Sequence, residues 1–396
     1  MSKMKKLIPE LRFPEFENEG EWEIKTIGDV ANSESSSMAL NKLDLKPTGY
    51  PVYGADSIVG YIDEFQHKDK YISIVKDGSG VGRLNLCQSN SSILGTLTSL
   101  KSKNKKQYDL VWLYYLLNTV DFSVYVKGAG IPHIYYSDFK NEIVPVPNPK
   151  EQQKIASCLA SLDDLIESHN QKLDLLKDHK KGLMQNLLPQ EGEKVPKLRF
   201  KEFENDGEWL EKKLGQIGEP LMCKRIFKEQ TSESPTDGVP FYKIGTFGKE
   251  ADSYIPIDLY EEFKNKYSFP KVGDILISAS GTIGRLVVYD GAPAFFQDSN
   301  IIWLGNDEKN ILNSFLFYCY STITWQTSDG GIISRLYNSD FKNMQVRFPK
   351  NKIEQEKIAS CLAALDKLIT AQTEKIEQLK QHKKGLMQGL FPKMND

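Results

Sequence analysis

The chain has 396 residues, of which 40% are hydrophobic and 11% aromatic, and its formal net charge is −2 at pH 7. This length predicts two domains of ordinary size rather than one core, and the hydrophobic content excludes a disordered chain. No apolar run approaches the roughly 18–20 residues that span a bilayer, and no apolar segment follows the N-terminal lysines, so we expect neither a membrane segment nor a secretory signal. The five cysteines are scattered, which favours reduced thiols and a cytoplasmic location.

Blocks of the sequence recur, and this indicates a tandem duplication. Residues 151–190 and 354–393 are identical at 25 of 40 positions with a shift of 203, and residues 8–22 and 195–209 at 11 of 15 with a shift of 187. The motif SDFKN precedes each long block. The predicted parts are a short block at 1–22, a variable domain at 23–147, a long helix at 148–190, a linker with the second short block at 191–209, a variable domain at 210–350 and a second long helix at 351–396.

The long blocks have the periodicity of amphipathic helices. Asn148 and Asn351 stand where an N-cap is expected, each with a glutamate three residues later as the reciprocal acceptor, and Pro189 and Pro392 close the helices. The apolar stripe that we expect to form the helix–helix spacer contains Ile155, Leu159, Leu162, Ile166, Leu173, Leu176, Leu183 and Leu187 in the first helix and Ile358, Leu362, Leu365, Ile369, Ile376, Leu379, Leu386 and Leu390 in the second.

A helix of roughly 40 residues, about 60 Å long, with one narrow apolar stripe needs a partner helix, and the obvious partner is its twin. Two copies that pair through the same surface give a pseudo-twofold arrangement, with antiparallel helices and one globular domain at each end. His169 and Gln372 interrupt the stripe at equivalent positions. We expect this polar break to fix the register of the helices; a ligand role is the alternative.

The variable domains predict mixed α and β structure. Residues 71–86 and 274–288 each contain an apolar strand, a Gly/Ser-rich turn and a second strand that follows the letters GRL. Helices are predicted at 108–118 and 311–321, and each is followed by a glycine-bearing loop. The predicted fold class is therefore α+β: two globular domains and two long antiparallel helices in a pseudo-twofold internal repeat. Because the two domains share an order of elements but few residues, we expect them to bind two different targets.

The sequence lacks the usual catalytic signatures. The letters GSGVGR lie within a predicted hairpin and open no helix, so they are a poor dinucleotide fingerprint, and no P-loop motif is present. No His, Cys and carboxylate set has metal-ligand spacing. The Glu-x-Lys triplets at 23–25 and 211–213 lack the second carboxylate motif of a nuclease. We therefore expect no catalytic residue and no metal site.

Features that bind nucleic acid are better represented. Gly-rich turns bring backbone N–H groups close to a phosphate, and polar side chains beside them can contact phosphates or base edges. Basic clusters at 101–106 and 223–228 can neutralise phosphates. The alternative is that the turns only reverse the chain and the lysines are only solvated. The candidate contact residues are Lys76, Ser79, Arg83, Lys127, His133, Tyr135, Lys224, Arg225, Ser278, Ser280, Thr282, Arg285 and Arg335.

This order of blocks resembles the specificity subunit of type I restriction–modification enzymes. The run PKVGDILISASGTIGR, the SDFKN motif, the EQ.KIA..L..LD helix start and the HKKGLMQ.L.P helix end are similar to that family, and the resemblance covers essentially the whole chain. It implies that 23–147 and 210–350 are target recognition domains, each reading half of an asymmetric bipartite site in double-stranded DNA. The candidate residues are then donors on loops, because the family's base-contacting residues cannot be transferred one by one.

The resemblance also implies the partners. The helices would form the spacer and the dock for two methyltransferase subunits and two restriction subunits, and the chain itself would be non-catalytic. S-adenosylmethionine, ATP and Mg²⁺ would then be bound by the partner subunits. Two alternatives remain at this point: a coiled-coil adaptor that presents two protein-binding heads, and a duplicated enzyme with an unrecognised site.

Overall fold

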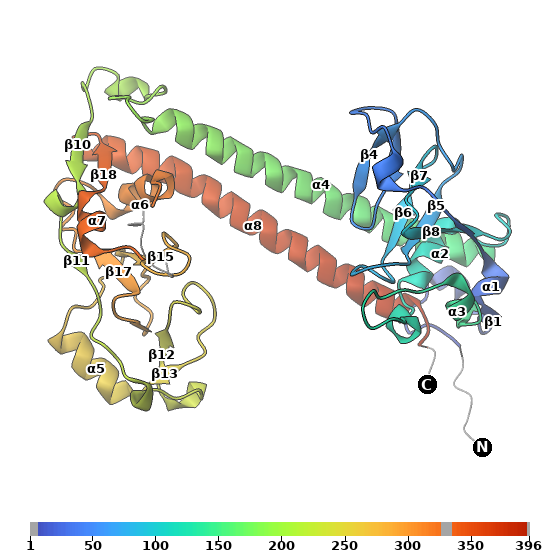
Figure 1. Cartoon of the computed structure of the whole chain (residues 1–396). Helices are drawn as coiled ribbons and strands as arrows, with labels where there is room; N and C mark the ends of the chain where they lie inside the picture. Colours follow the sequence, from blue (N-terminus) through green and yellow to red (C-terminus); the bar gives the residue numbers. More distant parts are fainter. Residues whose placement is uncertain (1–6, 326–334, 394–396) are drawn as a thin grey trace. The chain divides into compact units, whose positions relative to one another are not determined.

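The computed structural model describes residues 7–325 and 335–393 (Figure 1). The chain forms two compact units: residues 1–172 with 372–396, and residues 173–371. Each unit therefore contains one variable domain, the start of the long helix that follows it, and the end of the other copy's helix. Part of the second predicted glycine-bearing loop, 326–334, lies outside the described residues.

The two units have the same sheet topology. The first contains an antiparallel sheet in the order β2-β8-β5-β6, a three-stranded sheet β4-β3-β7 and the pair β1-β9; the second contains β11-β17-β14-β15, β13-β12-β16 and β10-β18. The strands of the first unit are β1 (Glu23–Thr26), β2 (Ala31–Ser35), β3 (Tyr50–Tyr53), β4 (Ile58–Ile62), β5 (Tyr71–Val75), β6 (Leu84–Cys87), β7 (Ser92–Ile93), β8 (Leu97–Ser102) and β9 (Ile143–Val146). Those of the second are β10 (Leu210–Lys213), β11 (Pro220–Leu221), β12 (Val239–Tyr242), β13 (Tyr254–Ile255), β14 (Ile275–Ser278), β15 (Leu286–Val288), β16 (Phe295–Phe296), β17 (Ile301–Leu304) and β18 (Gln345–Phe348).

Each unit also contains short helices. The first unit has α1 (Ile27–Val30), α2 (Leu110–Leu117) and α3 (Tyr136–Phe139); the second has α5 (Ile257–Lys266), α6 (Asn313–Thr322) and α7 (Asn338–Asn343). Single 3₁₀ turns lie at Pro14–Phe16, Leu40–Lys42, Phe122–Tyr125, Lys201–Phe203, Leu214–Gln216, Lys228–Gln230 and Pro235–Asp237. The predicted helices at 108–118 and 311–321 are confirmed as α2 and α6. Both predicted hairpins are confirmed, because β5 pairs antiparallel with β6 and β14 with β15.

The long helices are α4 (Pro149–Leu187) and α8 (Lys352–Leu390), each of 39 residues. The first stripe residues, Ile155 and Leu159 in α4 and Ile358 and Leu362 in α8, are at most 1% exposed and belong to the globular cores. At these ends the stripe packs against a globular core as well as against the twin helix, and the sequence predicted only the second of these contacts. A variable domain covers the first turns of its own helix, because two α-helices alone leave most of each surface in water.

Contacts within each unit give the helices opposite directions. In the first unit, the start of α4 shares a core with Leu390 and Phe391 at the end of α8. In the second unit, the start of α8 shares a core with Leu187 and Leu188 at the end of α4. The antiparallel prediction is therefore confirmed within each unit. At the polar break, Gln372 Nε2 donates to the His169 carbonyl oxygen over 2.7 Å.

The hydrogen bonds at the start of each long helix differ in part from those that the sequence predicted. Asn148 accepts hydrogen bonds from the backbone N–H groups of Lys150 and Glu151, so the N-cap is confirmed. The reciprocal bond predicted for Glu151 is wrong, because Arg12 donates to both carboxylate oxygens of Glu151 over 2.8 Å.

The second copy has the same arrangement. Arg199 donates to both oxygens of Glu354 over 2.8 Å, and the side chains are 9% and 0% exposed. These two carboxylates therefore bind the arginines of the short blocks and do not cap their own helices.

The short blocks also hold the end of the other copy's helix. The Leu11 N–H donates to the Gly389 carbonyl oxygen in α8 over 2.8 Å, and the Leu198 N–H donates to the Asn186 carbonyl oxygen in α4 over 2.9 Å. The repeated letters LRF therefore join one helix start to the other helix end. This explains why the short block and the long block are repeated together.

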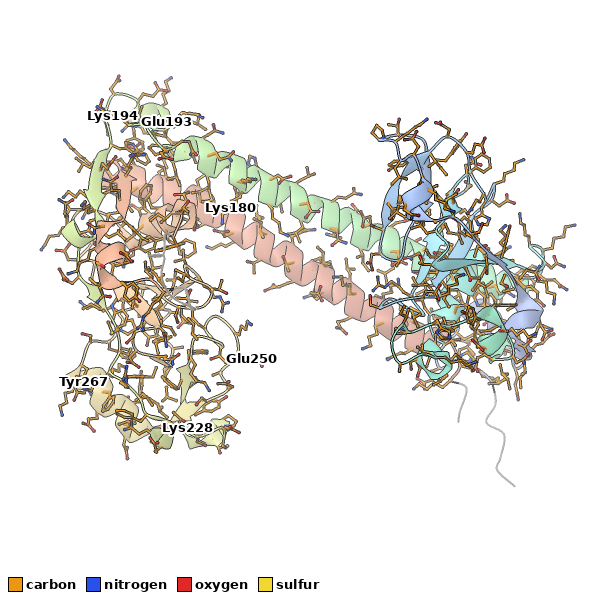
Figure 2. The ribbon with its side chains drawn as sticks, in the orientation of Figure 1. Lys180, Glu193, Lys194, Lys228, Glu250 and Tyr267 are labelled. Atoms are coloured by element: carbon orange, nitrogen blue, oxygen red, sulfur yellow. The ribbon has the colours of Figure 1, made fainter. Side chains whose placement is uncertain are left out.

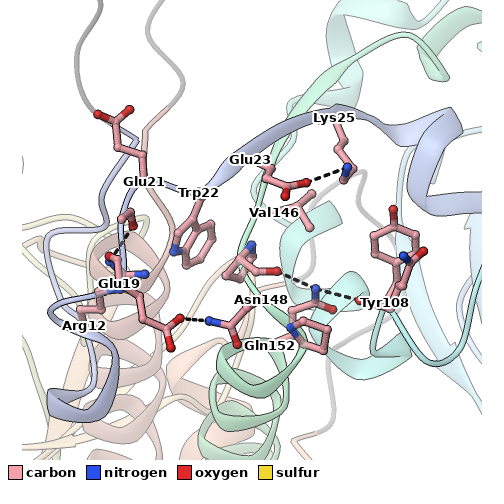
Figure 3. A pocket seen from close by; sticks show the side chains of 14 residues that line it. Arg12, Glu19, Glu21, Trp22, Glu23, Lys25, Tyr108, Val146, Asn148 and Gln152 are labelled. Atoms are coloured by element: carbon pink, nitrogen blue, oxygen red, sulfur yellow. Dashed lines mark hydrogen bonds and ion pairs between the residues drawn. The ribbon is translucent and has the colours of Figure 1, made fainter.

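A buried glutamine follows each of these glutamates. Gln152 donates to the carbonyl oxygens of Gln107 and Pro147 (Figure 3) and accepts from the Asp109 N–H. Gln355 makes the equivalent bonds to Asn310, Pro349 and Leu312. The letters EQ of the repeated helix start therefore tie α4 to α2 and α8 to α6.

Candidate nucleic-acid interface

The Gly-rich turns of the two hairpins are closed by equivalent hydrogen bonds, and the first turn is one residue longer than the second. The Gly82 N–H donates to the Val75 carbonyl oxygen, and the Gly284 N–H to the Ser278 carbonyl oxygen. Both glycines have positive φ, +86° and +83°. A side chain at Gly284 would also collide with the Trp325 ring, which lies 2.2 Å from its ideal Cβ position. Glycine is therefore required here both by conformation and by space.

A second segment lies beside each turn. In the first unit the Gly78 N–H donates to the Pro132 carbonyl oxygen, and the Ile134 N–H to the Lys76 carbonyl oxygen. In the second unit the Leu336 N–H donates to the Ala279 carbonyl oxygen over 2.8 Å. The structure thus brings the two predicted candidate segments, the hairpin turn and the end of the glycine-bearing loop, together in both units. We call these surfaces the first and second turn surfaces.

The first turn surface has exposed donors and rings. Ser79 and Tyr135 are exposed, and the His133 and Tyr135 rings lie 5.3 Å apart. Lys127 Nζ lies 2.6 Å from Asp138, and its side chain is 62% exposed. Lys127 hydrogen bonding lowers the pKa of Asp138, so this carboxylate stays charged. Lys76 is half-buried at the base of the turn.

The second turn surface carries different groups. Thr282 and Arg335 are exposed, and Arg335 Nη2 donates to the Ser299 carbonyl oxygen over 3.4 Å. Ser280 is half-buried, and its hydroxyl donates to Asn300 Oδ1 over 2.8 Å. Arg225, 61% exposed, forms an ion pair with Asp298 over 2.8 Å, next to the same loop. The two units therefore offer different functional groups on the same backbone frame.

Some candidates have structural roles instead. Ser278 is 0% exposed, and its hydroxyl donates to the Thr282 carbonyl oxygen and accepts from the Arg285 N–H. Its prediction as a DNA donor is wrong, because the turn uses the hydroxyl. Arg285 is half-buried and donates to the Phe247 carbonyl oxygen over 2.7 Å, while Arg83 is paired with Asp56. Either arginine would have to exchange its partner to contact DNA.

The two basic clusters differ. At 101–106, Lys101 pairs with Glu34, Lys105 with Asp69, and Lys103 donates to a backbone carbonyl oxygen, so each of these three lysines has a partner within the first unit. At 223–228, Lys224 Nζ lies 4.9 Å from the centre of the Tyr267 ring. Lys228 and Tyr267 lie at the end of the second unit that carries α5, away from Lys180 (Figure 2).

Sequence reasoning missed Arg12 and Gln152 with their counterparts, and it gave Glu151 a capping bond instead of the ion pair with Arg12. The signal was present, because each of these residues recurs at its equivalent position in the second copy. Among the described residues, no helix combines the length and apolarity needed to cross a membrane. Within 7–325 and 335–393, no group of three His, Cys, Asp or Glu side chains is placed to hold a metal ion.

Known proteins share this sequence and fold. A family model described as the type I restriction modification DNA specificity domain matches residues 19–178 and 206–381. A Haemophilus influenzae protein, named as a type I restriction enzyme specificity subunit, S.HindORF215P, is 35% identical over 365 residues, which cover 90% of each chain. The type I restriction enzyme MjaVIII specificity subunit of Methanocaldococcus jannaschii is 27% identical over 408 residues, which cover 95% of this chain and 92% of that protein.

The fold is found in a solved structure. The S subunit of a type I restriction–modification system from M. genitalium superposes with a TM-score of 0.69 at 19% identity, covering 98% of this chain and all of that one. The duplicated sheets, the paired long helices and the sequence relatives agree. The chain belongs to the family of type I restriction–modification specificity subunits.

Proposed function

We propose that this chain is the non-catalytic DNA-recognition subunit of a type I restriction–modification complex and that it reads an asymmetric bipartite target in double-stranded DNA. Each turn surface would read one half of the target. The recurrence of one backbone frame with different exposed groups in the two units supports this proposal most directly. Identical heads would favour a symmetric target, whereas these differ at equivalent positions beside the turns, with His133 in the first unit and Arg335 in the second.

The long helices would dock the partner subunits. Leu165 and Leu368 occupy equivalent positions and are 44% and 54% exposed, and Leu175 is 69% exposed. Apolar side chains exposed on a helix mark a surface that a partner can cover. We propose that two methyltransferase subunits bind here, that two restriction subunits join the complex, and that the partners bind S-adenosylmethionine, ATP and Mg²⁺.

Methylome sequencing of a host with and without this gene tests the bipartite target. We expect one motif made of two unlike halves separated by unread bases, and it should disappear with the gene. A full chain that shows no salt-dependent binding to duplex DNA would contradict the proposal, because phosphate contacts release counterions. The protein-binding adaptor would then be the better hypothesis.

The second turn surface gives a sharper test. Arg335→Ala should cost about 1–3 kcal/mol of binding free energy if the guanidinium reads a base, and it should relax one half-site only. Lys271→Ala is the matched control, since this exposed cation precedes β14 whereas the turn follows it. An Arg335→Ala variant with unchanged affinity and unchanged methylation motif would remove Arg335 from the interface.

A further inference from the structure

The repeated helix end HKKGLMQ places a lysine-lined groove in each unit. In the first unit a groove of about 670 Å³ lies between the end of α8 and the end of α2, and it is lined by Lys380, Lys383, Lys384 and Lys393. In the second unit a groove of about 450 Å³ lies between the end of α4 and the end of α6, and it is lined by Lys177, Lys180 and Lys181. We call these the first and second lysine grooves.

The two grooves are equivalent in detail. Lys177, Lys180 and Lys181 lie 203 positions before Lys380, Lys383 and Lys384, which is the shift of the sequence repeat. Residues 118–119 on one side of the first groove and 321–322 on one side of the second are related by the same shift. The duplication has therefore kept the grooves while the turn surfaces have diverged.

One lysine of each set is structural. Lys383 pairs with Asp163 and lies 5.2 Å from the centre of the Tyr115 ring. Lys180 pairs with Asp366 and lies 5.5 Å from the centre of the Tyr318 ring. These two lysines fasten the end of one helix to the other helix and to α2 or α6.

The remaining lysines keep their charge available. Lys181 and Lys384 are exposed, and in the part of the chain that the structure describes no carboxylate lies within 4.0 Å of either amine. Lys177 and Lys380 are also exposed and contact only a carboxylate on their own helix, Asp174 and Glu377. Such exposed pairs are weak and exchange readily with another anion.

The carboxylates in the first groove are occupied. Asp121 accepts from the Ser123 N–H and hydroxyl, and Glu142 accepts from the Tyr125 hydroxyl. The first groove has four lysines against two carboxylates, and the second has three lysines against Asp366, so both grooves present more positive than negative charge to a ligand.

Each lysine groove lies close to a turn surface of its own unit. Phe122 lies three positions after Thr119 of the first groove, and its Cβ is 3.1 Å from the ideal Cβ position of Gly82. Trp325, which packs on Gly284, likewise lies three positions after Thr322. Three residues span at most about 11 Å. Duplex DNA carries one charge per roughly 1.7 Å of axis, so DNA read at the turn brings several phosphates within this distance.

We propose that the lysine grooves are phosphate clamps that hold the DNA backbone beside each half-site. The clamp for the half-site read by one copy is supplied by the helix of the other copy, so each half-site is bound by residues from both repeats. This inference rests on the proposed DNA-recognition function. It predicts contacts that are independent of base sequence, which fits lysine, a flexible point charge, better than the forked arginine of base readout.

The test measures the salt dependence of binding by the full chain to a 30-base-pair duplex of random sequence and to its methylated target. Each phosphate contact contributes about 0.9 to the slope of log K against log salt. Lys177→Gln with Lys181→Gln should therefore reduce the slope by about 1.8 on both duplexes, with the methylation motif unchanged. Lys380→Gln with Lys384→Gln should do the same through the first groove.

Lys172→Gln with Lys375→Gln is the matched control. These exposed lysines are equivalent positions on the same two helices and line neither groove, so the charge removed is the same. The control should change the slope by less than half as much. Groove variants whose salt slope changes no more than that of the control would overturn the phosphate clamp. Variants that keep the wild-type slope but no longer co-purify with the methyltransferase subunit would overturn it as well. Failure of the wild-type chain to bind either duplex would instead overturn the DNA-recognition function itself.

Discussion

At the scale of single residues, His67 is a buried imidazole without a hydrogen-bond partner. It is 3% exposed, its ring centre lies 4.2 Å from that of Tyr71, and both ring nitrogens lack partners among the described residues. Burial lowers the pKa of His67, and Lys101 adds to this effect, while Glu34, 3.8 Å away, opposes it. Buried polar groups of this kind normally have a partner, so His67 costs stability whenever it must charge.

This environment predicts a loss of stability in mild acid. In the unfolded chain the histidine has a pKa of about 6.5. Below that pH the unfolded chain binds a proton more readily than the folded chain does. The contribution of His67 to the free energy of unfolding is therefore fully present above pH 6.5 and is lost as the pH drops below it. The loss is at most about 1.4 kcal/mol per pH unit. Urea unfolding of wild type and His67→Phe between pH 7.5 and 5.5 measures it, because the carboxylates common to both proteins cancel. Above pH 6.5 the free energies of unfolding of the two proteins should change with pH at the same rate, and below pH 6.5 that of the wild type should fall faster. The same pH dependence in both proteins throughout would show that His67 has no such effect.

At the scale of elements, the ion pair between a short block and a long helix holds the start of that helix. Breaking a buried pair by removing one partner costs about 3–5 kcal/mol, because it leaves a buried charge without compensation. Arg199→Met should therefore reduce the free energy of unfolding by about that amount, since Glu354 is fully buried. Lys201→Met, an exposed change in the same block, should have little effect. Urea unfolding compares them, and a cost below about 1 kcal/mol for Arg199→Met would mean that Glu354 finds another partner or becomes protonated.

Local sequence signals were sufficient for the elements themselves. The hairpins of β5 with β6 and of β14 with β15, the helices α2 and α6, and both long helices follow from alternation, periodicity and glycine placement, which act over a few residues. The Arg12–Glu151 pair was not predicted, because its partners lie 139 positions apart and a local capping pattern explained the same glutamate.

The same limit applies to the candidate site. The sequence identified the turns, but the contact of Arg285 with Phe247 joins residues 38 positions apart, and the hydroxyl of Ser278 is used inside the turn itself. Hydroxyl and guanidinium groups look alike in sequence whether they face solvent or complete a turn. The repeat contained more information than the composition of either turn, because it marked the polar residues that both copies keep.

At the scale of the whole molecule, each unit contains elements from both repeats. The chain passes from one unit to the other at residues 172–173 in α4 and at residues 371–372 in α8. A change at one junction therefore acts on a helix that both units share, while the same insertion at both junctions lengthens the two helices equally. Under the proposed function, one turn surface reads each half-site, and the two helices set the spacing between the half-sites. The half-sites and their spacing can therefore be changed separately.

That separation predicts the effect of lengthening both helices. Seven residues make nearly two helical turns, so insertions of seven residues at both junctions should keep the apolar stripes in phase and add about 10 Å to each helix. At about 3.4 Å per base pair, the unread gap of the target should grow by about three base pairs, with both half-sites unchanged. An insertion at only one junction should abolish methylation, because it puts the two stripes out of register. Methylome sequencing of the three strains measures the gap, and a double-insertion variant that methylates the original motif would show that the helices do not set the spacing.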